Sequence, residues 1–184
     1  NRMIISIGMA INPYILDYYK LNKKEYDIAA RNILILIIGG IICLLFIVAL
    51  FSNEIVLFFF NDLYSTDIVE LSILIIMSYS FRALFWVPTN RLFLDEKVEN
   101  LWKISTVGGL INIVLNIILI PIFGYKIAAY TTFLSMAYFG VFGFYLSEYK
   151  KVKMVEFYPL FWMFLIIFLT VILNVLQFYN ILIK

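Results

Sequence analysis

Arg82 is the residue of this sequence with the clearest chemical potential, because it lies inside a long apolar run from Ile68 to about Leu94. As a helix, that run places Arg82 roughly 21 Å from its first residue, and an arginine at such depth should avoid lipid. Its planar guanidinium can form a structural ion pair or carbonyl contact with another helix, or it can hold a phosphate group through paired hydrogen bonds. Both uses remain open. Helical spacing adds Tyr79 and Trp86 to the same side, where aromatic rings could stack on sugars.

A second set of polar side chains lies in the stretch from Ser105 to Ser135, which predicts two membrane helices joined by a tight turn. Asn112 and Asn116 are one helical turn apart on the first helix. They could line a cavity or hydrogen-bond to a neighbouring helix, and interhelical packing is the more common use of such residues. Pro121 and Gly124 are expected to end this first helix.

Small residues around these asparagines predict close helix packing. The second helix carries a stripe of small side chains at Ala128, Thr132 and Ser135, which would let a neighbour approach. On the first helix, Gly109 shares a face with Asn112. We therefore expect added bulk at Gly109 to be more harmful than the loss of polarity at Asn112.

The residue inventory argues against enzyme chemistry. The sequence has no histidine and a single cysteine, Cys43, so neither a histidine-based nucleophile pair nor a histidine and cysteine metal site is available. The carboxylates fall in loops or at helix ends rather than in pairs within a span. We expect no catalytic residue, no metal site and no cofactor.

Composition defines the class of protein. Of the 184 residues, 64% are hydrophobic and 14% charged, and the mean hydropathy is +0.99. Soluble domains have roughly 25% charged residues, so this chain has too little polar surface for water. A net charge of +2 with scattered basic clusters does not favour nucleic-acid binding.

Apolar runs predict an all-α, polytopic transmembrane helix bundle of about six spans. The expected spans are residues 1–18, 33–51, 68–94, 102–121, 126–147 and 157–179, and the run 17–31 is expected to be a short amphipathic connector. Ten of the 14 basic residues lie in segments 17–31, 91–103 and 148–156, which are therefore expected inside, whereas the acidic loop 52–67 and the turn with Lys126 are expected outside. Because the sequence begins at Asn1 without a methionine, we expect a C-terminal portion of a longer protein.

One pattern in the hairpin resembles a known family. Asn112, Asn116, Ile120, Pro121, Gly124, Ala128 and Ala129 follow the spacing "N, three residues, N, four, P, two, G, three, A, A". In this pattern and in the order of its helices the chain resembles the Wzx-type polysaccharide flippases, which export O-antigen or capsule repeat units. They belong to the multidrug/oligosaccharidyl-lipid/polysaccharide exporter superfamily.

The resemblance implies a transporter of about 12 to 14 helices built from two related bundles, of which this chain would hold part. Its implied activity is alternating-access movement of an undecaprenyl-diphosphate-linked oligosaccharide across a bacterial cytoplasmic membrane. Apart from the resemblance, the polarity and spacing of the residues give our hypothesis for the substrate-binding side chains, which are Arg82, Tyr79, Trp86, Asn112 and Asn116. The implied partners are membrane lipid, the lipid-linked glycan, the N-terminal half of the protein, and the polysaccharide polymerase with its chain-length machinery.

Two alternatives stay open at this point. The first is a cation-coupled drug or metabolite antiporter of the same superfamily, although no carboxylate lies deep in these spans. The second is a membrane glycan polymerase, for which we would expect a long external loop to hold acceptor sugars. The predicted outer loops are short.

Overall fold

The computed structural model describes residues 22–60 and 65–183, and all regular structure in these ranges is helical. The long helices are α2 (Lys23–Leu50), α4 (Ser65–Ser78), α5 (Ser80–Leu94), α6 (Leu101–Phe123), α7 (Ile127–Phe142) and α9 (Pro159–Ile183). Shorter elements are α3 (Ser52–Phe60), the 3-10 turn η2 (Gly143–Tyr145) and α8 (Ser147–Val152). Five helical segments of the described chain are long and apolar enough to cross a membrane, with α4 and α5 together making one of them. The predicted span at residues 1–18 lies outside the described residues.

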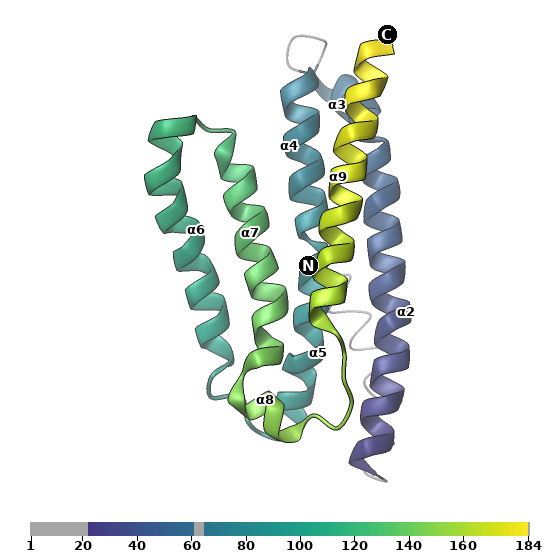
Figure 1. Ribbon diagram of the computed structural model, residues 1–184, viewed down its shortest axis with the longest axis vertical. Coiled ribbons are helices and arrows are strands. Elements are labelled where there is room, and N and C mark those ends of the chain that lie inside the picture. The colour runs from purple at the N-terminus through teal and green to yellow at the C-terminus, as the bar shows by residue number, and fades with distance from the viewer. Residues whose placement is uncertain (1–21, 61–64, 184) are drawn as a thin grey trace.

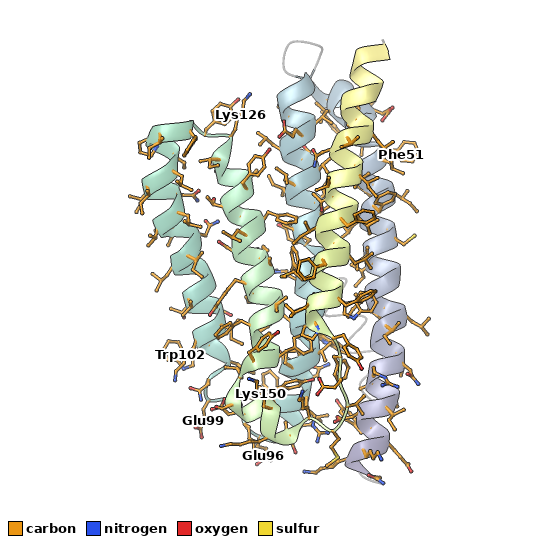
Figure 2. All side chains as sticks on the ribbon, viewed as in Figure 1. Phe51, Glu96, Glu99, Trp102, Lys126 and Lys150 are labelled. Atoms are coloured by element: carbon orange, nitrogen blue, oxygen red, sulfur yellow. The ribbon has the colours of Figure 1, made fainter. Side chains whose placement is uncertain are left out.

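The helices run alternately up and down, so that the loops gather at two ends (Figure 1). The start of α2, the link from α5 to α6, and α8 share one end, whereas α3 and the turn between α6 and α7 lie at the other. Figure 2 shows Glu96, Glu99 and Lys150 at the first end and Lys126 at the opposite one. The two groups of loops that the charge pattern separates are therefore at opposite ends of the bundle.

Helix α2 begins earlier than the apolar pattern predicted. The side-chain Oδ1 of Asn22 accepts a hydrogen bond from the Lys24 amide at 2.9 Å and caps the helix, which then continues to Leu50. The prediction of a connector over residues 17–31 is thus wrong from Lys23 onward. Because Asn22 caps the helix, the charged residues that follow it form the first turns of α2 and continue directly into the apolar part.

Two other predicted loops also contain helices. Ser52–Phe60, predicted as part of an outer loop, is the helix α3, and Ser147–Val152 within the third basic segment is α8. Both have an apolar side that packs inward: Val56 of α3 is buried, as are Tyr149 and Val152 of α8. Tertiary packing of these few side chains offsets the weak helical preference of such short segments.

The predicted span from Ile68 to Leu94 is divided at Tyr79 into α4 and α5. At this point the backbone makes tighter bonds, from the Tyr79 amide to the Ile76 carbonyl at 3.2 Å and from the Arg82 amide to the Tyr79 carbonyl at 3.1 Å. The division places Arg82 in the first turn of α5.

The hairpin of α6 and α7 is present, and its first helix is slightly longer than predicted. Pro121 lies inside α6 rather than at its end. A proline removes one backbone hydrogen bond, and a membrane helix tolerates this loss. The helix stops at Gly124, whose φ of 77° suits glycine and whose amide donates to the Ile120 carbonyl at 2.8 Å. Helix α6 packs mainly on α7, and its outer face is apolar and exposed.

The main core of the bundle joins side chains of α2, α5, α7, α8 and α9, and within it α5 and α7 approach most closely at two glycines. A Cβ atom built on Gly140 would lie 2.5 Å from the Phe81 carbonyl oxygen, and one on Gly143 would lie 2.6 Å from Pro88 Cγ. A side chain at position 140 would clash with the backbone of α5, and one at position 143 would clash with the ring of Pro88, so glycine permits the close approach at both positions. Beside this close approach Phe81 packs edge-on against Phe133, with ring centroids 5.3 Å apart.

Candidate functional site

A groove of about 460 Å³, mainly apolar but with several polar side chains in its lining, lies where α5 faces the hairpin of α6 and α7. Its lining combines one cation with amide, hydroxyl, glycine and apolar groups: Arg82, Ser105, Gly108, Gly109, Asn112, Ile113, Thr132, Ser135, Met136 and Phe139. Arg82 and Asn112, two of the residues selected from the sequence, thus lie on the same groove. Most of its polar groups are neutral, and Arg82 supplies the positive charge.

Arg82 is oriented by aromatic packing rather than by a carboxylate. Its guanidinium carbon lies 5.9 Å from the centroid of the Phe139 ring, which in turn packs on Phe85 at 4.1 Å. In the described part of the chain, the buried Nε of Arg82 has no hydrogen-bond partner, and neither does the fully buried hydroxyl of Ser80. The guanidinium therefore keeps hydrogen-bonding capacity for another group.

The asparagines of α6 connect the two helices of the hairpin. Asn116 Nδ2 donates to Asn112 Oδ1 at 3.0 Å, and Asn112 Nδ2 donates to Thr132 Oγ1 at 3.2 Å. The Thr131 hydroxyl donates to Asn116 Oδ1 at 2.6 Å. Asn116 is therefore held within the hairpin, whereas Asn112 takes part in the same network and also borders the groove.

The glycines of α6 differ from the sequence expectation. Gly108 is buried and faces α7, with Tyr138 Cδ1 and the Ser135 carbonyl oxygen 3.6 Å and 3.8 Å from a built Cβ. Gly109 lines the groove, and a Cβ there would meet nothing within 4 Å among the described residues. The prediction that Gly109 packs tightly against a helix is wrong for the described structure. The face of α6 that meets α7 carries Gly108, the residue before Gly109 in the chain, and Gly108 makes the close contact.

Tyr79 and Trp86 lie away from this groove. Tyr79 is 44% exposed at the junction of α4 and α5. Trp86 packs against the main core and lines a small cavity with Tyr26, Asp27 and Arg91. The predicted stripe along one continuous helix is thus split between different surroundings, and the structure brings together Arg82 and Asn112 but not the two aromatic residues.

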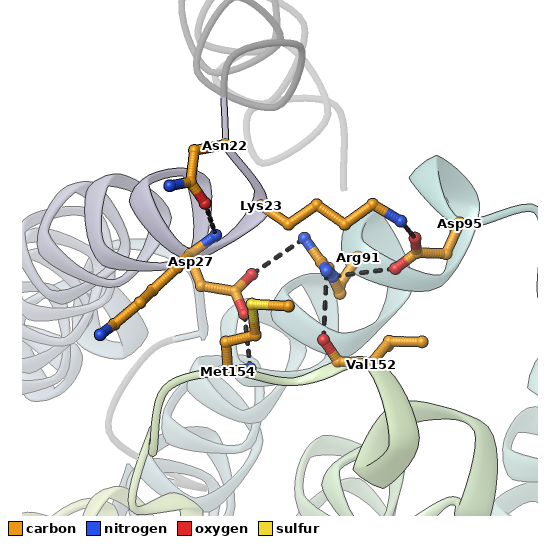
Figure 3. A network of polar contacts seen from close by, with 8 residues as sticks. Asn22, Lys23, Asp27, Arg91, Asp95, Val152 and Met154 are labelled. Atoms are coloured by element: carbon orange, nitrogen blue, oxygen red, sulfur yellow. Dashed lines mark hydrogen bonds and ion pairs between the residues drawn. The ribbon is translucent and has the colours of Figure 1, made fainter.

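A buried cluster of charges at the other end of α5 was not predicted from the sequence (Figure 3). Arg91 lies 3.1 Å from Asp27 of α2 and 3.0 Å from Asp95, and these three side chains are each about 4–5% exposed. Lys23 pairs with Asp95 at 2.8 Å. The i, i+4 spacing of Arg91 and Asp95 is a weak signal for their pair, but nothing in the sequence connects them to Asp27.

Backbone groups at the end of α8 and just after it complete this charge cluster. Arg91 Nη2 donates to the Val152 carbonyl at 3.1 Å, and the Met154 amide donates to Asp27 Oδ2 at 2.7 Å. The link from α8 to α9 is thereby tied to both α2 and α5. Burial raises the pKa of the nearby Tyr149 hydroxyl, which has no hydrogen-bond partner among the described residues. The two cations and two carboxylates of the cluster pair with one another. We therefore interpret the cluster as a structural clamp that holds α2, α5 and the end of α8 together.

The described residues contain no group of three or more His, Cys, Asp or Glu side chains that could hold a metal ion. The fold defines a multi-pass helical membrane protein, and its groove offers one cation among neutral polar groups. No family model, curated protein or solved structure matches the chain.

Proposed function

We propose that this chain is part of an alternating-access flippase that moves an undecaprenyl-diphosphate-linked oligosaccharide from the inner to the outer leaflet of a bacterial cytoplasmic membrane. The observation that carries this proposal is Arg82, which lines the groove between α5 and the hairpin and has a buried Nε without a partner in the described chain. The resemblance of the hairpin to polysaccharide flippases supplies the substrate class.

The groove has the chemistry needed for a phosphate group. Arginine engages phosphate oxygens through paired charge-assisted hydrogen bonds, and these strengthen when water is excluded. Arg82 lies about midway along the apolar span Ile68–Leu94, and an ionisable side chain at that depth is a candidate ligand for a charged substrate.

The remaining lining suits an attached sugar. Asn112, Thr132 and Ser135 carry amide or hydroxyl groups that can exchange hydrogen bonds with sugar hydroxyls, and Phe139 adds an aromatic face. Under this proposal the diphosphate contacts Arg82, the sugar follows the hairpin, and the isoprenoid chain remains in lipid. Helices of the N-terminal half would cover the exposed side of α6.

Deletion of the full gene tests the reaction class. We expect complete lipid-linked oligosaccharide units to accumulate in the cytoplasmic leaflet. Unpolymerised units outside the cell would instead indicate a polymerase, and unchanged lipid-linked species would indicate an antiporter of other substrates. Either result would overturn the proposal.

Complementation of the deletion tests the groove. Arg82→Ala should abolish transport at normal membrane levels, whereas Arg82→Lys should retain part of it because the charge remains but paired hydrogen bonding is lost. Lys103→Ala, at an exposed cation near the start of α6, is the matched control and should transport normally. Wild-type transport by a stably expressed Arg82→Ala variant would refute the role of Arg82.

A further inference from the structure

We propose that a second groove, between α2, α5 and the start of α9, binds an anionic membrane phospholipid. This groove has a volume of about 570 Å³ and shares no lining residue with the groove at Arg82. Its lining residues come from four regions of the chain, and those that matter here are Arg31, Ile35, Ile38, Leu84, Glu156 and Trp162. The inference does not depend on the proposed flippase function.

The groove is amphipathic along the direction of α2. Its polar lining residues are Arg31 and Asn32, in the first half of α2, and Glu156, in the link from α8 to α9. The start of α2 and α8 lie at the end of the bundle that carries the basic loops (Figure 1). From Arg31 to Ile38 the helix rises by roughly 10 Å, and over this distance the lining becomes apolar. Ile38 and Leu84 are almost fully buried and form the floor. A phospholipid fits this arrangement, with its headgroup at the polar end of the groove and an acyl chain along the apolar part.

Aromatic residues mark the level at which a headgroup would lie. Tyr158 and Phe161 are largely exposed, and Trp162 packs partly against the main core. Tyrosine and tryptophan gather at the membrane interface because they have an apolar body and a polar tip. Their position beside Arg31 places the polar end of the groove at the height of lipid phosphates.

The charges at the mouth favour an anionic lipid. Arg31 is half-buried, and no ion pair or hydrogen bond of its guanidinium is found in the described structure. Glu156 does not cancel it, because the Glu156 carboxylate is paired with Lys153 at 2.5 Å. Arg31 can therefore meet a lipid phosphate while its aliphatic stem lies along apolar surface. A basic residue at the membrane surface attracts anionic lipids with about 1 kcal/mol.

Photo-crosslinking of the purified protein tests this site. The protein is reconstituted in nanodiscs with phosphatidylglycerol or phosphatidylcholine, each carrying a diazirine on the acyl chain, and crosslinked peptides are identified by mass spectrometry. We expect phosphatidylglycerol to label α2 and the start of α9. Arg31→Gln should reduce this labelling about fivefold, the equivalent of about 1 kcal/mol, and leave phosphatidylcholine labelling unchanged.

Two further variants separate this site from general effects. Lys24→Gln removes an exposed cation from the same helix outside the groove and should label normally. Ile35→Trp, at a side chain 44% exposed, should fill the groove and suppress labelling by both lipids while the protein remains monodisperse. Arg82→Ala should leave labelling unchanged even if it abolishes transport. Equal labelling of Arg31→Gln and wild type by phosphatidylglycerol, or protein–protein crosslinks showing that another part of the chain occupies the groove, would overturn the inference.

Discussion

The close crossing of α5 and α7 gives a direct test of the packing that positions Arg82. In Gly140→Ala the new Cβ would lie 2.5 Å from the Phe81 carbonyl oxygen and 2.9 Å from Phe81 Cβ, whereas carbon–oxygen contacts normally begin at roughly 3.3 Å. The carbonyl belongs to the backbone of α5, so the two helices must move apart. Overpacking of this kind costs about 1–3 kcal/mol, and the better helix propensity of alanine offsets about 1 kcal/mol of it.

Gly109→Ala is the matched control for this prediction. It makes the same change inside a helix, but the new Cβ meets nothing within 4 Å among the described residues. It should therefore keep or slightly raise stability. A difference of 1 kcal/mol corresponds to about 2–4 °C in melting temperature for a chain of this size.

Scanning fluorimetry of the tryptophans in detergent measures both glycine variants. Gly140→Ala should melt several degrees below Gly109→Ala, and its transport should fall with the displacement of Phe139 from Arg82. Equal melting temperatures for the two variants would show that α5 and α7 do not cross as closely as described.

Three further predictions address topology and the end of the bundle near α8. In a Cys43→Ser background, an impermeant thiol reagent added to whole cells should label Lys126→Cys and not Glu99→Cys; the reverse result would invert the orientation. Arg91→Ala should destabilise the protein by about 3–5 kcal/mol because it leaves the buried Asp27 carboxylate without its cation, whereas Lys153→Ala in an exposed pair should cost less than about 1 kcal/mol; equal melting shifts would contradict this. Tyr149→Phe removes a buried hydroxyl without a hydrogen-bond partner in the described chain, so its melting temperature should be unchanged or higher, and a large decrease would reveal a missing partner.

The sequence alone was sufficient to predict that the protein is a helical membrane bundle and which loops lie together at each end of it. Both predictions depend on strong signals in the sequence. Long uninterrupted apolar runs require helices in lipid, and the distribution of lysine and arginine divides the loops into two groups. Element ends were less predictable. Asn22 begins α2 through a local cap, and α3 and α8 form because a few side chains, such as Tyr149, find places in the core. Hydropathy does not report contacts of that kind.

The candidate groove was predictable in part for the same reason. Arg82 and Asn112 are polar residues in apolar helices, a signal that one sequence can give, and they lie on a common groove. The position of Trp86 was not predictable from ideal helical spacing. Arg82 and Trp86 are one turn apart on α5, but spacing does not say which neighbour lies beside each of them. Trp86 packs against the main core and borders a small cavity with Tyr26 and Asp27 of α2.

The two arginines of α5 have different surroundings at the two ends of this helix. Arg91, at the far end of α5, is clamped to Asp27 and to the Val152 carbonyl, so this end of the helix has little freedom. Arg82, in the first turn of α5, lies beside the tighter turn at Tyr79 and keeps a buried Nε without a partner in the described chain. Because a transporter must release its ligand, a cation held by aromatic packing suits a binding role better than one fixed in a buried ion pair. The sequence separates the two arginines by depth, since Arg91 begins the basic segment 91–103 and Arg82 lies deep in the apolar run, but only the contacts show that Arg91 is clamped and that Arg82 is not.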